Sequence, residues 1–152
     1  MTKLQNGFWL GLIALALLGA AAAEKTTQAN DDISQLQGEW TRVSGSADGY
    51  AVPEPLLGNS KRICKGNETT VMLNGRLLFK ARFVVDASKS PKTIDYEMIE
   101  GATKGRTQLG IYELKGDTVR FCFGSPGAAR PKEFVSQPGD GRTLSLWKRK
   151  KD

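Results

Sequence analysis

Histidine is absent from this chain of 152 residues. Nucleophilic catalysis by a Ser-His-Asp or Cys-His arrangement requires an imidazole, and so do the usual catalytic zinc sites. Cysteine is scarce as well: only Cys64 and Cys122 occur, too far apart in the sequence for a metal-ligand motif. We therefore expect no catalytic residues, no metal site and no cofactor, and we predict that the protein is not an enzyme.

Long apolar runs are also scarce, since only the N-terminus carries one. Lys3 supplies a positive first region, Phe8 to Leu18 form an apolar stretch, and the small residues 20–23 precede a cleavage site. We interpret residues 1–23 as a secretory signal peptide that is cut after its last alanine. An uncleaved membrane anchor is the alternative, although the run from Gly7 to Ala23 is short for crossing a bilayer. We expect an exported protein, periplasmic or extracellular, without a stable membrane span.

The formal net charge of +6 falls to +5 when this segment is removed, because it holds one lysine and no acidic residue. A basic balance is compatible with an anionic polymer of the cell envelope as a partner, or simply with solubility. We expect no nucleic-acid partner outside the cytoplasm, and the sequence does not indicate an oligomeric state. A disordered polar segment at 24–30, one domain at 31–149 and a basic tail at 150–152 complete the predicted organisation.

The clearest structural pattern is a β-hairpin between Leu109 and Phe123. Two β-rich runs flank Gly116-Asp117, and glycine in the first position of a two-residue loop favours a type II′ turn. That turn predicts a cross-strand pair of Glu113 with Arg120 on one face. The alternate residues form an apolar face that we expect to contact a core: Tyr112, Leu114, Val119, Phe121 and Phe123.

Similar patterns predict six further strands. Turns at Gly66-Asn67 and Asn74-Gly75 connect three of them, and Asn-Gly between β-rich runs is a strong hairpin signal. A proline-rich loop at 49–59, with a helical turn at 55–57, and a long loop at 124–142 interrupt the meander. The predicted strands outside the hairpin are 36–44, 60–65, 68–73, 76–86, 93–99 and 143–148.

A closed sheet is the architecture that these strands favour. No predicted helix is long enough to cover an open sheet, and bare strand edges invite aggregation. The sequence therefore predicts an all-β fold: an eight-stranded antiparallel up-and-down barrel with a short N-terminal helical turn, capped by Asp31 or Asp32 and ending at Gln37. A β-sandwich is the alternative. In the strand at 76–86 the alternate residues from Leu77 to Val85 are all apolar, and we expect this face to point inward.

The strand map also bears on the two cysteines. An even number of cysteines in an exported protein favours a disulfide. However, the turn registers place Ile63 inward and Cys64 outward, and the hairpin places Cys122 outward as well. Three strand spacings, about 14 Å, would then separate the cysteines, whereas a disulfide requires Cα atoms within about 7 Å. We therefore predict two free thiols, unless a bulge shifts one register.

Three of these residues resemble the lipocalin signature. They are Gly38 and Trp40 on the first predicted strand and Arg149 at the end of the last. In lipocalins the tryptophan closes one end of the barrel and the arginine stacks on it, a cation–π contact of about 0.5–2 kcal/mol. The resemblance implies that Trp40 and Arg149 are in contact at a closed end of the barrel.

A closer resemblance covers nearly all of the mature chain. It is to an uncharacterised family of lipocalin-like secreted domains expanded in planctomycete bacteria. The residues that carry it are, in order, Leu36-Gln37-Gly38-x-Trp40, Asp48-Gly49, Val52-Pro53, Pro91-Lys92-x-Ile94-Asp95, Gly110-Ile111-Tyr112-x-Leu114, Gly116-Asp117, Cys122-Phe123 and Arg130-Pro131-x-Glu133-Phe134. Cys64 departs from the pattern, which has an aromatic or aliphatic residue there. The resemblance implies the fold and export but no established activity.

Two places could bind a ligand: the barrel interior and the longest loop. The candidate ligand-binding residues are Phe83, Tyr112, Phe123, Arg130 and Phe134. In the alternative interpretation Phe134 docks the loop on the barrel and Arg130 ties down its backbone. We predict an exported lipocalin-like binding protein for a small apolar or amphipathic molecule. The alternative is a structural or interaction protein of the envelope whose barrel is filled by side chains.

Overall fold

The structure, a computed structural model, describes residues 10–152. Lys3 and Phe8 of the predicted signal peptide lie outside this range, and cleavage after Ala23 stays a prediction. The elements are α1 (Leu10–Leu36), β1 (Gly38–Ala47), β2 (Tyr50–Ala51), α2 (Glu54–Leu57), β3 (Ser60–Lys65), β4 (Glu68–Leu73), β5 (Arg76–Asp86), β6 (Lys92–Gly101), β7 (Thr107–Lys115), β8 (Thr118–Phe123) and β9 (Thr143–Arg149). Within the described range, neither helix combines the length and the apolar character that a membrane span needs.

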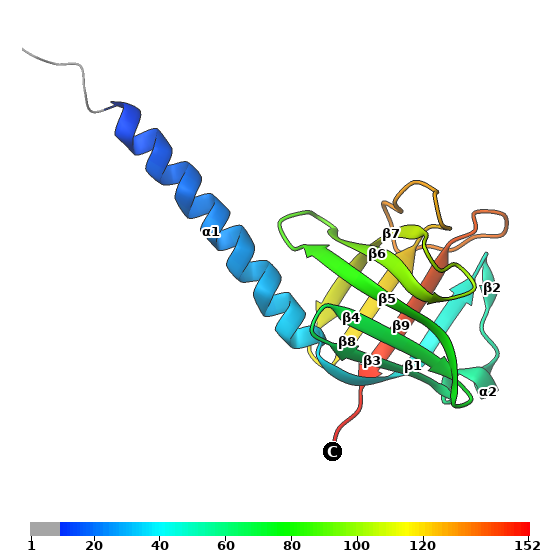
Figure 1. The fold of residues 1–152 in the computed structure, drawn as a ribbon. Coiled ribbons are helices and arrows are strands. Elements are labelled where there is room, and N and C mark those ends of the chain that lie inside the picture. The colour runs from blue at the N-terminus through cyan, green and yellow to red at the C-terminus, as the bar shows by residue number, and fades with distance from the viewer. Residues whose placement is uncertain (1–9) are drawn as a thin grey trace, which may run out of the picture.

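Eight of the strands form one closed antiparallel barrel (Figure 1). They follow each other around it in the order β1-β3-β4-β5-β6-β7-β8-β9, and the pairing of β1 with β9 closes the circle. β2 is a two-residue strand that pairs with the end of β1, at Ser46 and Ala47. The predicted eight-stranded up-and-down barrel is confirmed, with β2 and a longer N-terminal helix as additions.

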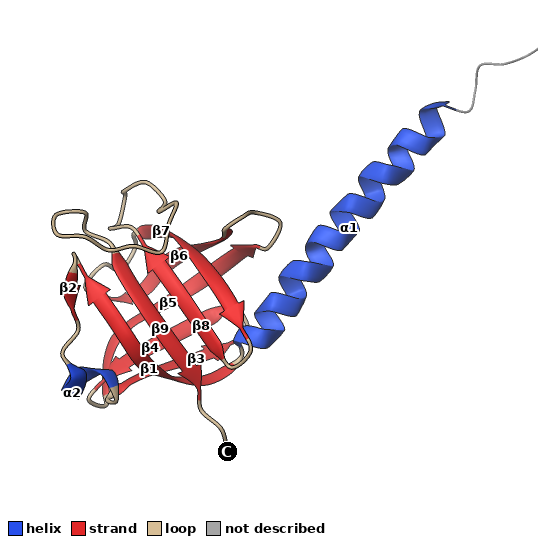
Figure 2. Ribbon diagram, turned by 180° about the vertical axis from the view of Figure 1, so that it is seen from behind, coloured by secondary structure: helices blue, strands red, loops and turns tan. Residues whose placement is uncertain are grey.

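The two ends of the barrel differ. α1 runs directly into β1 at one end, where the tight turns at 66–67 and 116–117 also lie; this is the closed end. Because neighbouring strands are antiparallel, the connections at 48–59, 74–75, 101–106 and 124–142 all start and finish at the opposite end. Figure 2 shows α1 meeting the barrel on one side and α2 and β2 on the other.

α1 is much longer than the single helical turn expected from the sequence. Residues 24–30, expected to be disordered, belong to it. Asp32 lies within the last turns of the helix, where its side chain contacts the barrel, and does not cap the helix start. The alanine-rich sequence favours helix, and adding a residue to an existing helix is easier than starting one. Ala29, Ile33 and Leu36 pack on the barrel, whereas the N-terminal part projects away from it (Figures 1 and 2).

The hairpin at 109–123 has the predicted register, including the pairing of Glu113 with Arg120. Gly116 has φ 58°, as the first position of a type II′ turn requires. Asn74 and Gly75 have φ 53° and 75°, the two positive values of a type I′ turn. The turns of both hairpins that the sequence predicted most strongly are therefore confirmed, and Asn74, Gly75 and Gly116 have the positive φ that their turn types require.

One register differs from the prediction because of a bulge in β5. Met72 pairs with Leu77 and Val71 pairs with Phe79, so Leu78 is left without a partner. From this point the whole pairing of β4 is shifted by one residue. Leu77, predicted to point inward, is 43% exposed, and the bulged Leu78 is 49% exposed.

A shift of one residue exchanges the two faces of a strand. In β3 the buried side chains are therefore those of Ser60, Arg62 and Cys64, and the prediction that Ile63 points inward and Cys64 outward is wrong. Cys64 lies inside the barrel. Cys122 lies on the outer face of β8 under the long loop, where its thiol contacts the Val135 carbonyl. Both cysteines are buried and free, three strands apart as the strand order predicted.

Candidate functional site

A cavity of about 250 Å³ occupies the open half of the barrel. All eight barrel strands contribute to its lining, and Val52 and Leu78 border it near the open end. This cavity is termed the cup. It is larger than the engineered apolar cavity of about 150 Å³ that binds benzene, and close to the lower limit of about 300 Å³ for drug-sized pockets.

Side chains fill the barrel beyond the cup toward the closed end. Trp40, Phe83, Tyr112 and Phe121 are each at most 2% exposed and belong to one apolar core. The cup therefore ends on packed aromatic rings and does not run through the barrel. Its own wall is partly aromatic too: Phe79, Tyr96, Phe123 and Trp147.

Two arginines line this mostly apolar cavity. Arg62, on β3, is only 3% exposed, and its guanidinium lies between Phe121 and Trp147, 4.6 Å from each ring centroid. Its Nη1 donates hydrogen bonds to the Thr69 hydroxyl at 3.0 Å and to the Tyr96 hydroxyl at 2.7 Å. Its Nε is buried and has no partner. The arginine is thus held firmly in place while part of its donor capacity remains unused.

Arg42, on β1, approaches the same tryptophan. Its guanidinium lies 5.4 Å from the Trp147 ring centroid, and its Nε is likewise buried without a partner. Burial lowers the pKa of Arg42, and the nearby charge of Arg62 lowers it further. Both causes disfavour the charged form, so the fold holds two like charges close together in a poorly hydrated place.

No acidic side chain neutralises these two charges. In the part of the chain that the structure describes, no Asp or Glu lines the cup, and neither Arg42 nor Arg62 belongs to an ion pair. Buried charges in proteins are normally paired. The cup therefore has an excess of positive charge and unused hydrogen-bond donors. Chemically, it can accept an anionic group attached to an apolar body.

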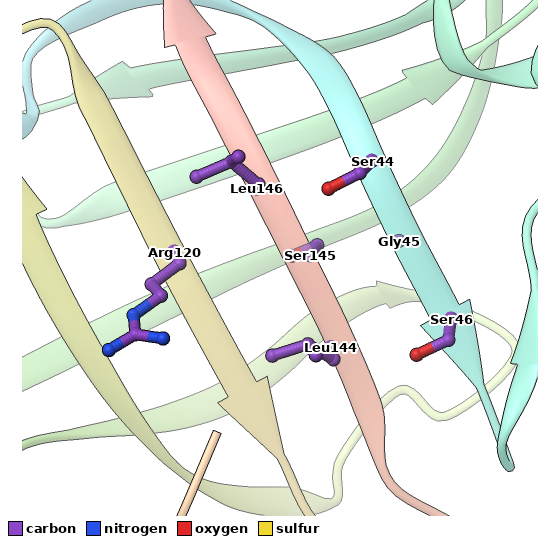
Figure 3. Close-up of a pocket in the computed structure, with 7 residues that line it drawn as sticks. All are labelled: Ser44, Gly45, Ser46, Arg120, Leu144, Ser145 and Leu146. Carbon is purple, nitrogen blue, oxygen red and sulfur yellow. The ribbon is translucent and has the colours of Figure 1, made fainter. Parts of the chain in front are cut away.

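A second hollow lies on the outside of the barrel (Figure 3). This groove has a volume of about 360 Å³ and is bordered by three neighbouring strands. Its lining includes Leu144 and Leu146 of β9, Ser44 and Ser46 of β1, and Arg120 of β8. The groove is open along the outer wall, whereas the cup is enclosed by strands on all sides. Its single charged side chain is already paired across the hairpin. We therefore regard the cup as the stronger candidate site.

The five candidate ligand-binding residues lie in three different places. Phe123 lines the cup. Phe83 and Tyr112 belong to the packed core, although Tyr112 and Phe134 also border a shallow pocket of about 240 Å³ on the outside near the closed end. Arg130 and Phe134 contact the outer wall and do not line the cup. The structure does not bring the five together in one site.

The long loop follows the outer wall because specific contacts hold it there. Arg130 donates a hydrogen bond to the Gly110 carbonyl at 2.7 Å and pairs with Asp95 at 2.6 Å. The Phe134 ring lies 3.9 Å from the Arg120 guanidinium. These contacts correspond to the alternative interpretation, in which both residues fix the loop on the barrel.

Sequence reasoning missed both arginines of the cup, although signals for each are present. Arg42 follows Trp40 by two residues on the same strand, and alternate residues share a face. In β3, Lys61 and Lys65 lie on the same face and lysine prefers solvent. Placing this face outside assigns Arg62, on the other face, to the interior. The apolar Ile63 favoured the opposite assignment of the two faces. The register counted from the turn at 74–75 agreed with that assignment only because it did not include the bulge in β5.

The closed end carries the lipocalin-like residues, and here the prediction is confirmed. The Arg149 guanidinium lies 4.3 Å from the centroid of the Trp40 ring. Gly38 has φ 104°, a conformation that suits glycine, where the chain turns from α1 into β1. The buried Trp40 donates a hydrogen bond from its indole to the Leu36 carbonyl at 2.9 Å, and Arg149 donates to the Gln37 carbonyl at 2.7 Å.

A buried carboxylate joins α1 to the barrel at the same end. Asp32, 1% exposed, accepts hydrogen bonds from the Lys92 ammonium at 2.7 Å and from the Tyr112 hydroxyl at 2.6 Å. Gln28 donates to its other oxygen at 3.2 Å. Burial, and second the hydrogen bond to Asp32, raise the pKa of Tyr112 well above its usual range. This cluster is fully engaged in fixing the helix and has no free group for a ligand.

The fold and the site together define a closed antiparallel β-barrel with a positively charged internal cup. Comparisons with models of protein families, with curated proteins and with solved structures gave no match. Among residues 10–152, no group of acidic or cysteine side chains is arranged to hold a metal ion.

Proposed function

We propose that this protein is a lipocalin-like binding protein that holds a small amphipathic molecule in the cup. The observation that supports the proposal is the cavity of about 250 Å³ enclosed by all eight strands. A barrel filled by side chains, the alternative considered from the sequence, would leave voids of no more than a water molecule or two, each about 30 Å³. Binding requires no chemistry of the protein, in keeping with a role other than an enzyme.

The proposal includes the cellular location and the family resemblance inferred from the sequence. The protein would be exported after removal of residues 1–23 and would belong with the lipocalin-like secreted domains of planctomycete bacteria. The closed barrel supports this kinship, as does the contact of Trp40 with Arg149. N-terminal sequencing of the protein recovered from its own cell envelope tests the predicted cut.

Native mass spectrometry tests ligand binding directly. The protein purified from its own source is expected to carry a small molecule that is released on unfolding. Ser145→Phe places a ring in the cup, since Ser145 faces inward on β9, and should abolish the retained mass. Ser44→Phe introduces the same ring on the exposed outer face of β1 and serves as the matched control. If neither the wild-type protein nor the control carries or takes up a small molecule, the proposed function is wrong.

A further inference from the structure

We propose that the ligand of the cup is a carboxylate with a small aromatic or short aliphatic body, and that Arg42 and Arg62 bind its carboxylate group. This inference rests on the proposed function and specifies the chemical class of the ligand. It starts from the guanidinium groups of Arg42 and Arg62, which line one cavity and each keep a buried Nε without a hydrogen-bond partner among the described residues. Among the described residues no acidic side chain pairs with either of them, and because buried charges are normally paired, the two guanidinium groups call for an anionic partner from outside the chain.

The contacts of Arg62 within the protein do not replace that partner. The rings of Phe121 and Trp147 stabilise its charge through cation–π contacts, and the hydroxyls of Thr69 and Tyr96 accept hydrogen bonds from one nitrogen. None of these four groups carries a negative charge. They fix the orientation of the guanidinium before a ligand arrives, which lowers the entropy lost on binding.

Arginine is the side chain suited to this task. Its planar fork of N–H donors matches the two oxygens of a carboxylate, and such charge-assisted pairs are roughly twice as strong as neutral hydrogen bonds. Arg42 and Arg62 approach the same Trp147 ring from neighbouring strands and both line the cup, so we expect one small anion in the cup to interact with both charges. A single negative charge would also relieve the repulsion between the two arginines.

The rest of the cup indicates the body of the ligand. Phe79, Phe123 and Trp147 offer apolar ring surface beside the arginines. A cavity of about 250 Å³ accommodates a benzene ring, which fits in about 150 Å³, together with a short substituent. Benzoate and hexanoate are therefore suitable probes.

Matched acids and alcohols test the charge requirement. Binding of benzoate and hexanoate to the full-length protein is measured by titration calorimetry and by the intrinsic tryptophan fluorescence, to which Trp147 in the cup contributes, and compared with benzyl alcohol and 1-hexanol. We expect each acid to bind at least about tenfold more tightly than its alcohol, since hydrogen bonds to charged groups contribute about 1.5 kcal/mol or more. Arg42→Met and Arg62→Met should each remove this preference.

Arg82→Met is the control for loss of a positive charge. Arg82 lies on β5 and its side chain, paired with Glu97, is exposed on the outside of the barrel. This variant should bind the acids as the wild-type protein does. Thermal melts of all three variants establish that each is folded.

The outcomes separate the two proposals. If wild-type protein binds acid and alcohol equally, or if Arg42→Met keeps the full preference for the acid, the inference is overturned while a binding function stands. If neither acid nor alcohol binds and the native protein retains no small molecule, the proposed function fails together with it. The comparison of acids and alcohols on the wild-type protein is decisive even if Arg62→Met does not fold.

Discussion

Replacing Trp40 by alanine tests how the closed end of the barrel is held together. The side chain is fully buried, and removing a large buried aromatic destabilises a protein by about 3–5 kcal/mol. That range contains the lost packing, the hydrogen bond to the Leu36 carbonyl and the contact with Arg149. The free energy of unfolding of small domains is about 5–15 kcal/mol, so the variant should lose a large share of its stability.

The surroundings of the indole explain why relaxation will not recover much of this energy. A helix leaves its last four carbonyls without partners inside the helix. Here the Leu36 carbonyl accepts from Trp40, and the carbonyls of Gln35 and Gln37 accept from Arg149. Removing the indole leaves the buried Leu36 carbonyl without a donor and takes away the ring that supports the arginine. The start of β1 and the end of β9 are both affected, because these two strands close the barrel.

Urea denaturation followed by circular dichroism measures the loss. A double-mutant cycle with Arg149→Met isolates the contact between the two side chains, and a coupling of about 0.5–2 kcal/mol is expected. Tyr50→Ala is the control, because this aromatic residue is 69% exposed on β2 and its removal should change stability by less than about 0.5 kcal/mol. A loss below about 1.5 kcal/mol for Trp40→Ala, or strictly additive effects in the cycle, would refute this account of the closed end.

Four further expectations follow from the same structure. Asp32→Asn should lower the free energy of unfolding by about 1–3 kcal/mol in urea titrations, because a buried charged acceptor is lost; an unchanged midpoint would mean that α1 is not held there. The fold raises the pKa of Tyr112, whereas the same tyrosine in the unfolded chain ionises near pH 10. Above about pH 10 the unfolded chain therefore binds fewer protons than the native protein, and the free energy of unfolding should fall by up to about 1.4 kcal/mol per pH unit. Tyr112→Phe should show a shallower decline, and an equal slope would contradict this assignment. Glu113→Ala breaks an ion pair whose side chains are 41% and 45% exposed, so thermal melts should show a loss below about 1 kcal/mol. Cys64 and Cys122 should both react with a thiol reagent in unfolded, unreduced protein and hardly at all in the native state; finding no thiol after unfolding would contradict the strand order.

The parts of the fold that local sequence determines were predictable. The hairpin at 109–123 depends on two turn residues and on alternation, and its register is as expected. The contact of Trp40 with Arg149 followed from a family resemblance together with closure of the sheet. In both cases the information lies in a few residues with strong conformational or chemical preferences.

The candidate site was not predictable in the same way, because it depends on one bulged residue. Leu78 lies in a run of apolar residues where several registers satisfy the alternation equally well. Its insertion turns β4 and β3 over and places Arg62 in the interior, against the usual preference of arginine for solvent. The extent of α1 was not predicted either: a continuous helix at Leu10–Leu36 replaces the short turn that a cap at Asp31 or Asp32 suggested.

Because both ends of the chain leave the barrel at its closed end, the protein can be attached to a surface or to another domain without covering the mouth of the cup. α1 and the residues after β9 both leave from the closed end, and Lys150 is still bound there to the Glu39 carbonyl. A tag, a surface or a fused domain joined at either terminus therefore leaves the mouth of the cup unobstructed. Immobilisation through the C-terminus should give the same affinity as measurement in solution, and a sensor can be built by fusing a fluorescent domain to either end. A probe meant to report on the mouth itself has to be inserted at 48–59, 74–75 or 101–106 instead.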